Sequence, residues 1–107
     1  MIPYMPDWLE TISKAEGFEW DIGNATKNAS KHAVTALEAE SVFANRPLLL
    51  LDDPAHSRHE VRAKAIGTTG AGRLLIVSFT LRNALIRVIS ARPMNKKERV
   101  IYEKANA

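Results

Sequence analysis

Residues 62–91 constrain the fold most, because they contain three apolar stretches separated only by short turns. The stretches are residues 62–68, 73–81 and 85–91. Two glycines mark the first connection, and Asn83, a residue that tolerates a positive φ, marks the second. Connections this short favour antiparallel neighbours, so the sequence predicts a meander of three antiparallel strands.

Two further strands are expected before this meander. Residues 18–21 alternate apolar and acidic side chains, and residues 48–51 form an apolar run too short for a helix. The residues that follow, 52–59, are predicted to form a surface loop. Together with the helices described next, these strands predict an α+β fold, a mainly antiparallel sheet of about five strands flanked by helices.

Three helix starts carry the same signal, an Asp, Thr or Asn followed three residues later by Glu. The signals begin at Asp7, Thr35 and Asn95, and a further short polar helix is expected at residues 24–32. In the helix that starts at Thr35, the predicted buried face consists of Leu37, Val42 and Phe43. Residues 1–17 are interpreted as an N-terminal helical extension and residues 18–107 as the main domain.

Composition excludes several classes of protein. The chain has 107 residues, of which 46% are hydrophobic and 25% charged, as in an ordinary globular domain. The absence of cysteine excludes disulfides, thiolate metal sites and a cysteine nucleophile. The N-terminus lacks the basic and apolar regions of a secretion signal, and no stretch is long enough to span a bilayer. We therefore expect a cytoplasmic protein that does not contact a membrane.

Charge is distributed unevenly along the chain. Residues 1–56 hold four basic and nine acidic residues, whereas residues 57–107 hold eleven basic and three acidic residues. Nine of those eleven basic residues lie between Arg62 and Arg99, in predicted strands and the last helix. A structured basic half favours a polyanionic partner, with nucleic acid the first candidate.

Among these basic residues, Arg62 and Arg92 are the strongest candidates for a phosphate site. Alternation places Arg62 and Lys64 on one face of their strand, and Arg92 lies at a strand end before a proline. The planar guanidinium suits phosphate because it donates two parallel hydrogen bonds. For Arg73 and Arg82, which flank turns, we expect solvated side chains. For Arg87, an ion pair with an acidic side chain remains open as an alternative to phosphate binding.

Lys31 and His32 form a second candidate group at the end of the polar helix. A histidine beside cationic groups can titrate near neutrality and serve as a general acid or base. The alternative is a structural cap, since Lys and His interact favourably with the last carbonyls of a helix.

Residues 52–60 contain two aspartates, a glutamate and two histidines, but their spacing matches no metal motif. No serine triad, phosphate-binding glycine loop or pair of catalytic carboxylates is evident. We therefore expect no cofactor and no metal.

Several of these segments, taken in order, resemble the BrnT family of toxins from bacterial type II toxin–antitoxin pairs. The resemblance covers about residues 18–103. The matching segments are Phe18-Glu19-Trp20-Asp21, Lys31-His32, Asp53-Pro54, Glu60-x-Arg62, Ile86-Arg87-Val88-Ile89-Ser90-Ala91-Arg92 and Glu98-Arg99-x-x-Tyr102-Glu103.

This resemblance implies a RelE-like fold and an RNA endonuclease that inhibits translation without a cofactor. It also implies a partner antitoxin of the BrnA type with a ribbon-helix-helix part. The toxin is then expected to associate with operator DNA only through this antitoxin. The substrate is then RNA, with ribosome-associated mRNA among the candidates. The reaction we hypothesise is attack of the ribose 2′-hydroxyl on its own phosphate, which yields a 2′,3′-cyclic phosphate.

Under this hypothesis Arg62 and Arg92 hold the phosphate, and His32 or Tyr102 transfers protons. The RNA backbone is contacted by Lys31, Lys64, Arg87 and Arg99. Tyr102 has an alternative role, which is to pack with Val100 and Ile101 against the sheet.

Two other functions remain open at this point. One is a non-catalytic module of the same fold that binds RNA or only its antitoxin. The other is an interaction subunit whose basic face receives an acidic partner, and whose behaviour towards RNA would be insensitive to salt.

Overall fold

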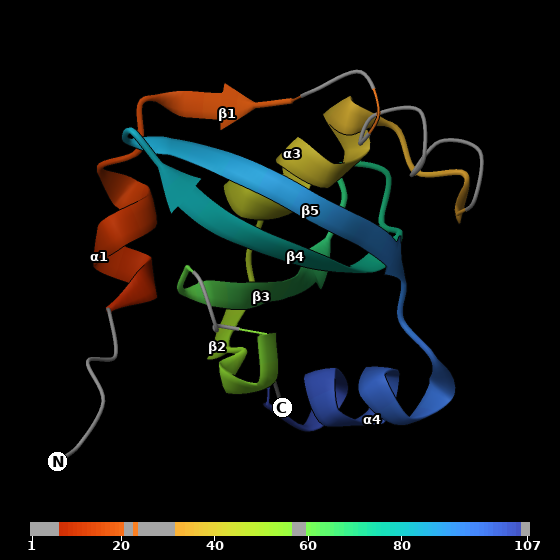
Figure 1. The fold of residues 1–107 in the computed structure, drawn as a ribbon. Coiled ribbons are helices and arrows are strands. Elements are labelled where there is room, and N and C mark those ends of the chain that lie inside the picture. The colour runs from red at the N-terminus through yellow and green to blue at the C-terminus, as the bar shows by residue number, and fades with distance from the viewer. Residues whose placement is uncertain (1–6, 21–22, 24–31, 57–59, 106–107) are drawn as a thin grey trace, which may run out of the picture.

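A computed structural model describes residues 7–20, 23, 32–56 and 60–105 (Figure 1). Its elements, in chain order, are α1 (Trp8–Ser13), β1 (Gly17–Glu19), α3 (Ala36–Ala44), β2 (Leu49–Asp52), a 3₁₀ turn (Pro54–His56), β3 (Arg62–Thr68), β4 (Leu74–Arg82), β5 (Leu85–Pro93) and α4 (Lys96–Ala105). The α+β class is confirmed. The helix predicted at residues 24–32 falls outside the described residues except for its last position.

The sheet has five strands in the order β1-β5-β4-β3-β2. Strands β2 to β5 pair antiparallel, which confirms the predicted meander, whereas β1 pairs parallel with β5. The β4–β5 turn has Asn83 and Ala84 at φ values of 53° and 64°, the left-handed conformation of a two-residue hairpin loop. Strand β5 was expected to end at Ala91, but it continues to Pro93, which is tolerated at a strand end.

One face of the sheet packs against α1 and α3 and forms the main core. Phe79 on β4 is fully buried, and its ring makes edge contacts with Trp8 of α1 at 5.3 Å and Phe43 of α3 at 5.1 Å. On β3 the residues that face α3 are small, and a Cβ added at Gly67 would lie 3.1 Å from Val42. Small residues on β3 therefore allow α3 to approach closely.

The helix-start signals at Asp7, Thr35 and Asn95 are confirmed. The backbone N–H of Glu38 donates to the Thr35 side chain, and the carboxylate of Glu38 accepts from the Thr35 N–H. One part of the prediction for this helix is wrong, because Leu37 is 78% exposed. Only the side of α3 that carries Val42 and Phe43 faces the sheet, and Leu37 projects from the opposite side.

The opposite face of the sheet is covered only in part, by α4. Tyr102 of α4 packs there with Ile66, Ile76 and Met94 in a second, smaller cluster. Val100 and Ile101 are 43% and 51% exposed, so the expectation that they pack with Tyr102 against the sheet is wrong for these two residues. The part of this face that α4 does not cover carries polar side chains.

Candidate active site

The uncovered part of this face forms a groove across β3, β4 and β5 with a volume of about 270 Å³. We call it the basic groove; it is lined by Asp53, Arg62, Lys64, Ile76, Ser78, Ile89, Ser90 and Arg92. In the sheet register, Lys64 lies opposite Ser78, which in turn lies opposite Ser90. The predicted placement of Arg62 and Lys64 on one face of their strand is confirmed.

A β-bulge determines which residues of β5 face the groove. The pairing of β4 with β5 shifts by one residue between Ser78 and Phe79, and Ile89 is the extra residue on β5. Arg87 and Arg92 are five positions apart, so regular alternation would place them on opposite faces. The bulge reverses the alternation between them, and both arginines therefore project from the groove side of the sheet.

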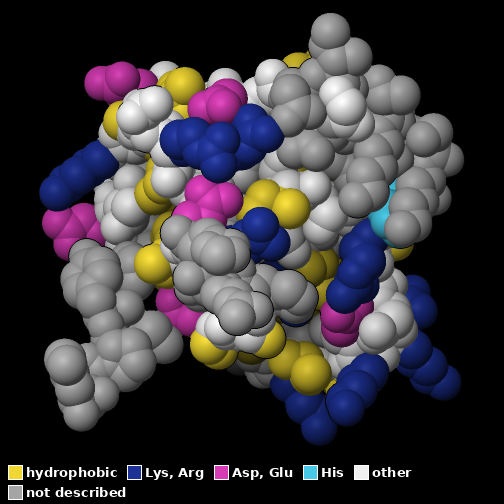
Figure 2. All heavy atoms as spheres, in the orientation of Figure 1, with side chains coloured by type: hydrophobic (Ala, Val, Ile, Leu, Met, Phe, Trp, Pro, Cys, Tyr) yellow, Lys and Arg dark blue, Asp and Glu magenta, His cyan; other side chains and the backbone are white. Residues whose placement is uncertain are grey.

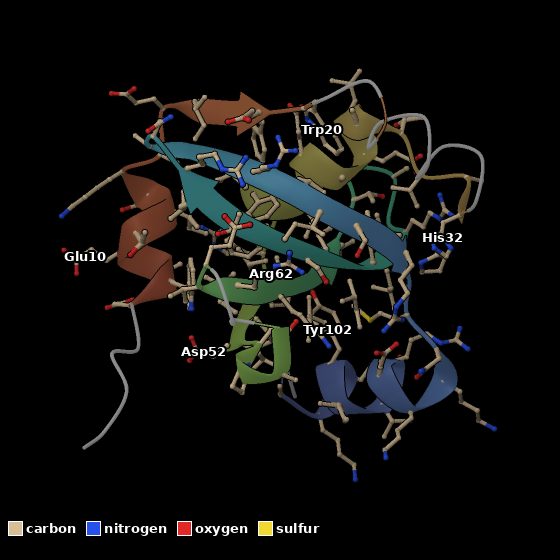
Figure 3. The ribbon with its side chains drawn as sticks, in the orientation of Figure 1. Glu10, Trp20, His32, Asp52, Arg62 and Tyr102 are labelled. Carbon is tan, nitrogen blue, oxygen red and sulfur yellow. The ribbon has the colours of Figure 1, made fainter. Side chains whose placement is uncertain are left out.

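Arg62, labelled in Figure 3, is the first residue of β3 and pairs with Thr80 of β4. Its Nε atom is fully buried, and its backbone carbonyl accepts a hydrogen bond of 3.0 Å from the N–H of Asp53. Asp53 is itself only 8% exposed. Arg62 and Lys64 thus place two cationic side chains in the groove, next to the carboxylate of Asp53 and the hydroxyls of Ser78 and Ser90.

Arg92 is held at the groove by Glu98 of α4. Its Nη1 and Nη2 atoms donate to the two carboxylate oxygens of Glu98, each at 2.7 Å. Hydrogen bonds from Arg92 and from the backbone N–H of Asn95 lower the pKa of Glu98 from 4.5 to about 2, against the opposing effect of burial. The same pair raises the pKa of Arg92.

Tyr102 does not line the groove. It is 5% exposed, and its hydroxyl donates to the carbonyl of Pro47 at 2.5 Å and lies 3.2 Å from the hydroxyl of Thr68. These contacts fit the packing role that the sequence left open for Tyr102.

His32 also lies apart from the groove lining, at the periphery of the molecule (Figure 3). It is helical, and Ala33 after it has a φ of 52°, which is how a helix commonly ends. Arg73 donates to the carbonyls of His32 and Ala33 at 3.1 and 2.7 Å and to Glu38 at 3.2 Å. The expectation that Arg73 is solvated is therefore wrong, because its guanidinium joins the backbone of His32 and Ala33 to the first turn of α3.

The other residues predicted to contact RNA are not all in the groove. Arg87 forms an ion pair of 2.8 Å with Glu19 of β1, the alternative that the sequence had left open. Arg99 is exposed on α4, and Lys31 lies outside the described residues. Lys64 lines the groove and makes no ion pair with any residue in the described ranges.

Apart from the pairing left open for Arg87, the acidic partners of the arginines are the feature that sequence reasoning missed. Besides Arg87 and Arg92, Arg82 pairs with Glu60 at 3.1 Å, so it is not simply solvated. Figure 2 shows the result on this side of the molecule, where basic and acidic side chains are interleaved. The acidic partners come from both halves of the chain, since Glu60 and Glu98 belong to the basic half, so the charge asymmetry of the sequence does not reveal the pairs.

Within the described ranges, no group of three or more His, Asp or Glu residues is arranged to hold a metal ion. Asp52 instead accepts a hydrogen bond of 2.7 Å from Trp8, and His59 is not among the described residues. None of the described helices has the length and apolar character needed to cross a membrane.

The groove is therefore suited to bind an anion. Cationic side chains from β3 and β5 surround two serine hydroxyls, in a concavity where a phosphate can accept hydrogen bonds from several directions. Guanidinium and ammonium groups in such a site also stabilise negative charge that develops on a bound phosphate.

A comparison with curated proteins gives no match. A family profile described as "Ribonuclease toxin, BrnT, of type II toxin-antitoxin system" matches residues 20–98. The matched span includes every residue that lines the basic groove, whereas α1, Arg99 and Tyr102 lie outside it. On this match, which covers most of the sequence, the chain belongs to the BrnT family of ribonuclease toxins of type II toxin–antitoxin systems.

Proposed function

We propose that the chain cleaves RNA in the basic groove without a metal ion. The ribose 2′-oxygen forms a bond to the adjacent phosphorus while the bond from phosphorus to the 5′-oxygen breaks. The 2′-hydroxyl loses its proton and the 5′-oxygen gains one, which leaves a 2′,3′-cyclic phosphate and a 5′-hydroxyl. The observation that carries this proposal is the groove itself, where Arg62, Lys64 and Arg92 surround two serine hydroxyls.

Arg62 and Lys64 bind the scissile phosphate and compensate the extra negative charge of the pentavalent phosphorane. Arg92 binds the same phosphate from the other side of the groove. The substrate is RNA rather than DNA, because only RNA carries the internal 2′-hydroxyl nucleophile.

Proton transfer is assigned to His32 or Tyr102, and the surroundings favour His32. Arg92 lies opposite Ile76, and Arg73, three residues before Ile76, donates to the His32 carbonyl. His32 therefore lies near the end of β4 and β5 that carries Arg73 and Arg92, and we propose that RNA leaving the groove at this end reaches it. The hydroxyl of Tyr102 would first have to release the Pro47 carbonyl.

The nucleotides on either side of the scissile phosphate are bound by Lys31, Arg87 and Arg99. Arg87 lies on the groove side of the sheet, and Arg99 is exposed on α4. Contacts of this kind bind phosphates without reading the bases.

Membership in a type II toxin–antitoxin family supports a cognate antitoxin. We propose a BrnA-type partner with a ribbon-helix-helix part, which silences the toxin and alone contacts operator DNA. Cleavage of mRNA, free or on the ribosome, then inhibits translation when the antitoxin is lost.

The test is cleavage of RNA by the purified protein in excess EDTA, with the chemical nature of the new ends mapped. We expect 2′,3′-cyclic phosphate and 5′-hydroxyl ends, and a loss of about 10²-fold to 10³-fold in kcat for Arg62→Ala. The matched control is Arg82→Ala, which removes an exposed arginine outside the groove. Cleavage that requires a metal, or equal losses in the two variants, would contradict the proposal.

One observation favours a second candidate, a module that binds RNA without cleaving it. The guanidinium fork of Arg92 is already bound to Glu98, which partly neutralises one of the three groove cations. Such a module would retain RNA in a salt-dependent manner but would produce no cyclic-phosphate ends.

A further inference from the structure

Arg92 is held in one orientation by contacts on two sides of its guanidinium group. Nη1 and Nη2 each donate to one oxygen of Glu98 at 2.7 Å, and Nη1 also lies 3.3 Å from the carbonyl oxygen of Pro93. The Arg92 side chain is 38% exposed, so without these contacts it would sample several rotamers.

The guanidinium group has five N–H donors in a fixed, planar arrangement. The Glu98 carboxylate accepts one hydrogen bond from Nη1 and one from Nη2. The second N–H of Nη1 donates to the carbonyl oxygen of Pro93. The Nε–H and the second Nη2–H remain, and no contact recorded for the described residues uses them. These two N–H groups lie on one edge of the guanidinium, which is a bidentate site for a phosphate.

Glu98 is itself fixed. One of its carboxylate oxygens accepts a hydrogen bond of 2.9 Å from the N–H of Asn95, and its own N–H donates to the Asn95 side chain at 2.8 Å. Its side chain is 22% exposed. The carboxylate that orients Arg92 is therefore attached to the first turn of α4, and α4 is attached to the sheet through Tyr102.

We propose that Glu98 is a positioning residue for RNA cleavage: it holds Arg92 so that the Nε and Nη2 edge of the guanidinium faces the scissile phosphate. The inference rests on the proposed function of the groove. Glu98 does not compete with the phosphate for Arg92, because the two anions use different edges of the same planar group.

A double-mutant cycle of Arg92→Ala and Glu98→Gln tests this assignment. We expect Glu98→Gln to lower kcat by about 10-fold to 100-fold with at most a severalfold rise in KM, because a misplaced group loses its advantage mainly in the transition state. The double variant should be no slower than Arg92→Ala alone. Glu60→Gln is the matched control, because it breaks the Arg82 ion pair outside the groove.

Two results would overturn the proposal. Faster cleavage by Glu98→Gln would mean that Glu98 restrains Arg92 instead of positioning it. Additive losses in the double variant would mean that Glu98 acts through the stability of α4. Arg92→Lys is a second variant for the same question, since it keeps the charge but not the fork, and it should be as slow as Glu98→Gln.

Two readouts do not depend on cleavage. The Arg92 Nε–H signal in ¹⁵N-edited NMR should be resolved in the wild type, lost or shifted in Glu98→Gln and unchanged in Glu60→Gln. An RNA oligonucleotide with 2′-deoxy substitution cannot be cleaved, and its binding should weaken severalfold in each single variant and no further in the double variant. If the wild type does not cleave RNA, the proposed function fails, and unchanged binding in both variants would overturn the positioning role as well.

Discussion

The stability contributed by the Arg92–Glu98 pair should disappear as the pH is lowered. In the folded protein the pKa of Glu98 is about 2, compared with 4.5 for an unperturbed glutamate. A carboxyl group with a depressed pKa stabilises the folded state fully above the unfolded value and loses that effect as the pH falls through the folded value. The window for this pair therefore runs from about pH 4.5 down to about pH 2.

The magnitude follows from the size of the pKa shift and the exposure of the pair. A shift of about 2.5 units corresponds to roughly 3.4 kcal/mol at about 1.36 kcal/mol per unit. The side chains of Arg92 and Glu98 are 38% and 22% exposed, so solvent screens part of this interaction. We expect a contribution of about 1–2 kcal/mol to the free energy of unfolding near neutral pH.

Urea unfolding of the wild type and Glu98→Gln across the pH range measures this contribution. Other carboxylates also titrate, so the informative quantity is the difference between the two proteins at each pH. The difference should be about 1–2 kcal/mol near pH 7 and should vanish near pH 2. A difference that stays constant over this range would refute the reasoning, because it would show that the carboxylate acts through its shape or its helix cap and not through its charge.

Three further perturbations follow from the structure. Trp8→Phe should cost about 1–3 kcal/mol, because it removes the donor to the Asp52 carboxylate, and thermal or urea unfolding measures this loss. Gly67→Ala should cost about 1 kcal/mol or more because its Cβ would crowd α3, whereas Gly70→Ala, with open space around it, should cost much less in the same unfolding assay. Lys64→Ala should reduce the slope of log K against log salt by about 0.7–0.9 in RNA-binding titrations, and an unchanged slope would remove Lys64 from the phosphate contacts.

The parts of the fold that could be predicted from sequence are those set by local interactions. Hydrogen bonds at helix starts span three residues, and the Thr35–Glu38 and Asn95–Glu98 pairs form as the sequence indicates. The hairpin at Asn83 depends on two backbone conformations within the turn itself. Strand alternation then correctly places Arg62 and Lys64 on one face.

The parts that could not be predicted depend on pairing between distant segments. The bulge beside Ser78 shifts the register of β5 by one residue, and no glycine or proline at Ile89 marks its position. Without it, the alternation assigns Arg87 and Arg92 to opposite faces of the sheet. The parallel contact that brings Glu19 to Arg87 joins residues 68 positions apart, and no local pattern signals it.

The ion pairs change what the charge asymmetry of the sequence means. Nine basic residues between Arg62 and Arg99 suggest a broad basic surface, but all four arginines in residues 73–92 are bound to acids, namely Arg73, Arg82, Arg87 and Arg92. An arginine bound to a carboxylate adds little to the field at a distance, while its remaining N–H groups can still bind a phosphate in direct contact. Recognition in the groove therefore depends more on where Arg62, Lys64 and Arg92 are held than on how many cations the chain carries. For this reason Glu98→Gln, which removes the carboxylate that holds Arg92, and Arg92→Lys, which keeps the charge but not the fork, are more informative about the groove than further removal of surface lysines.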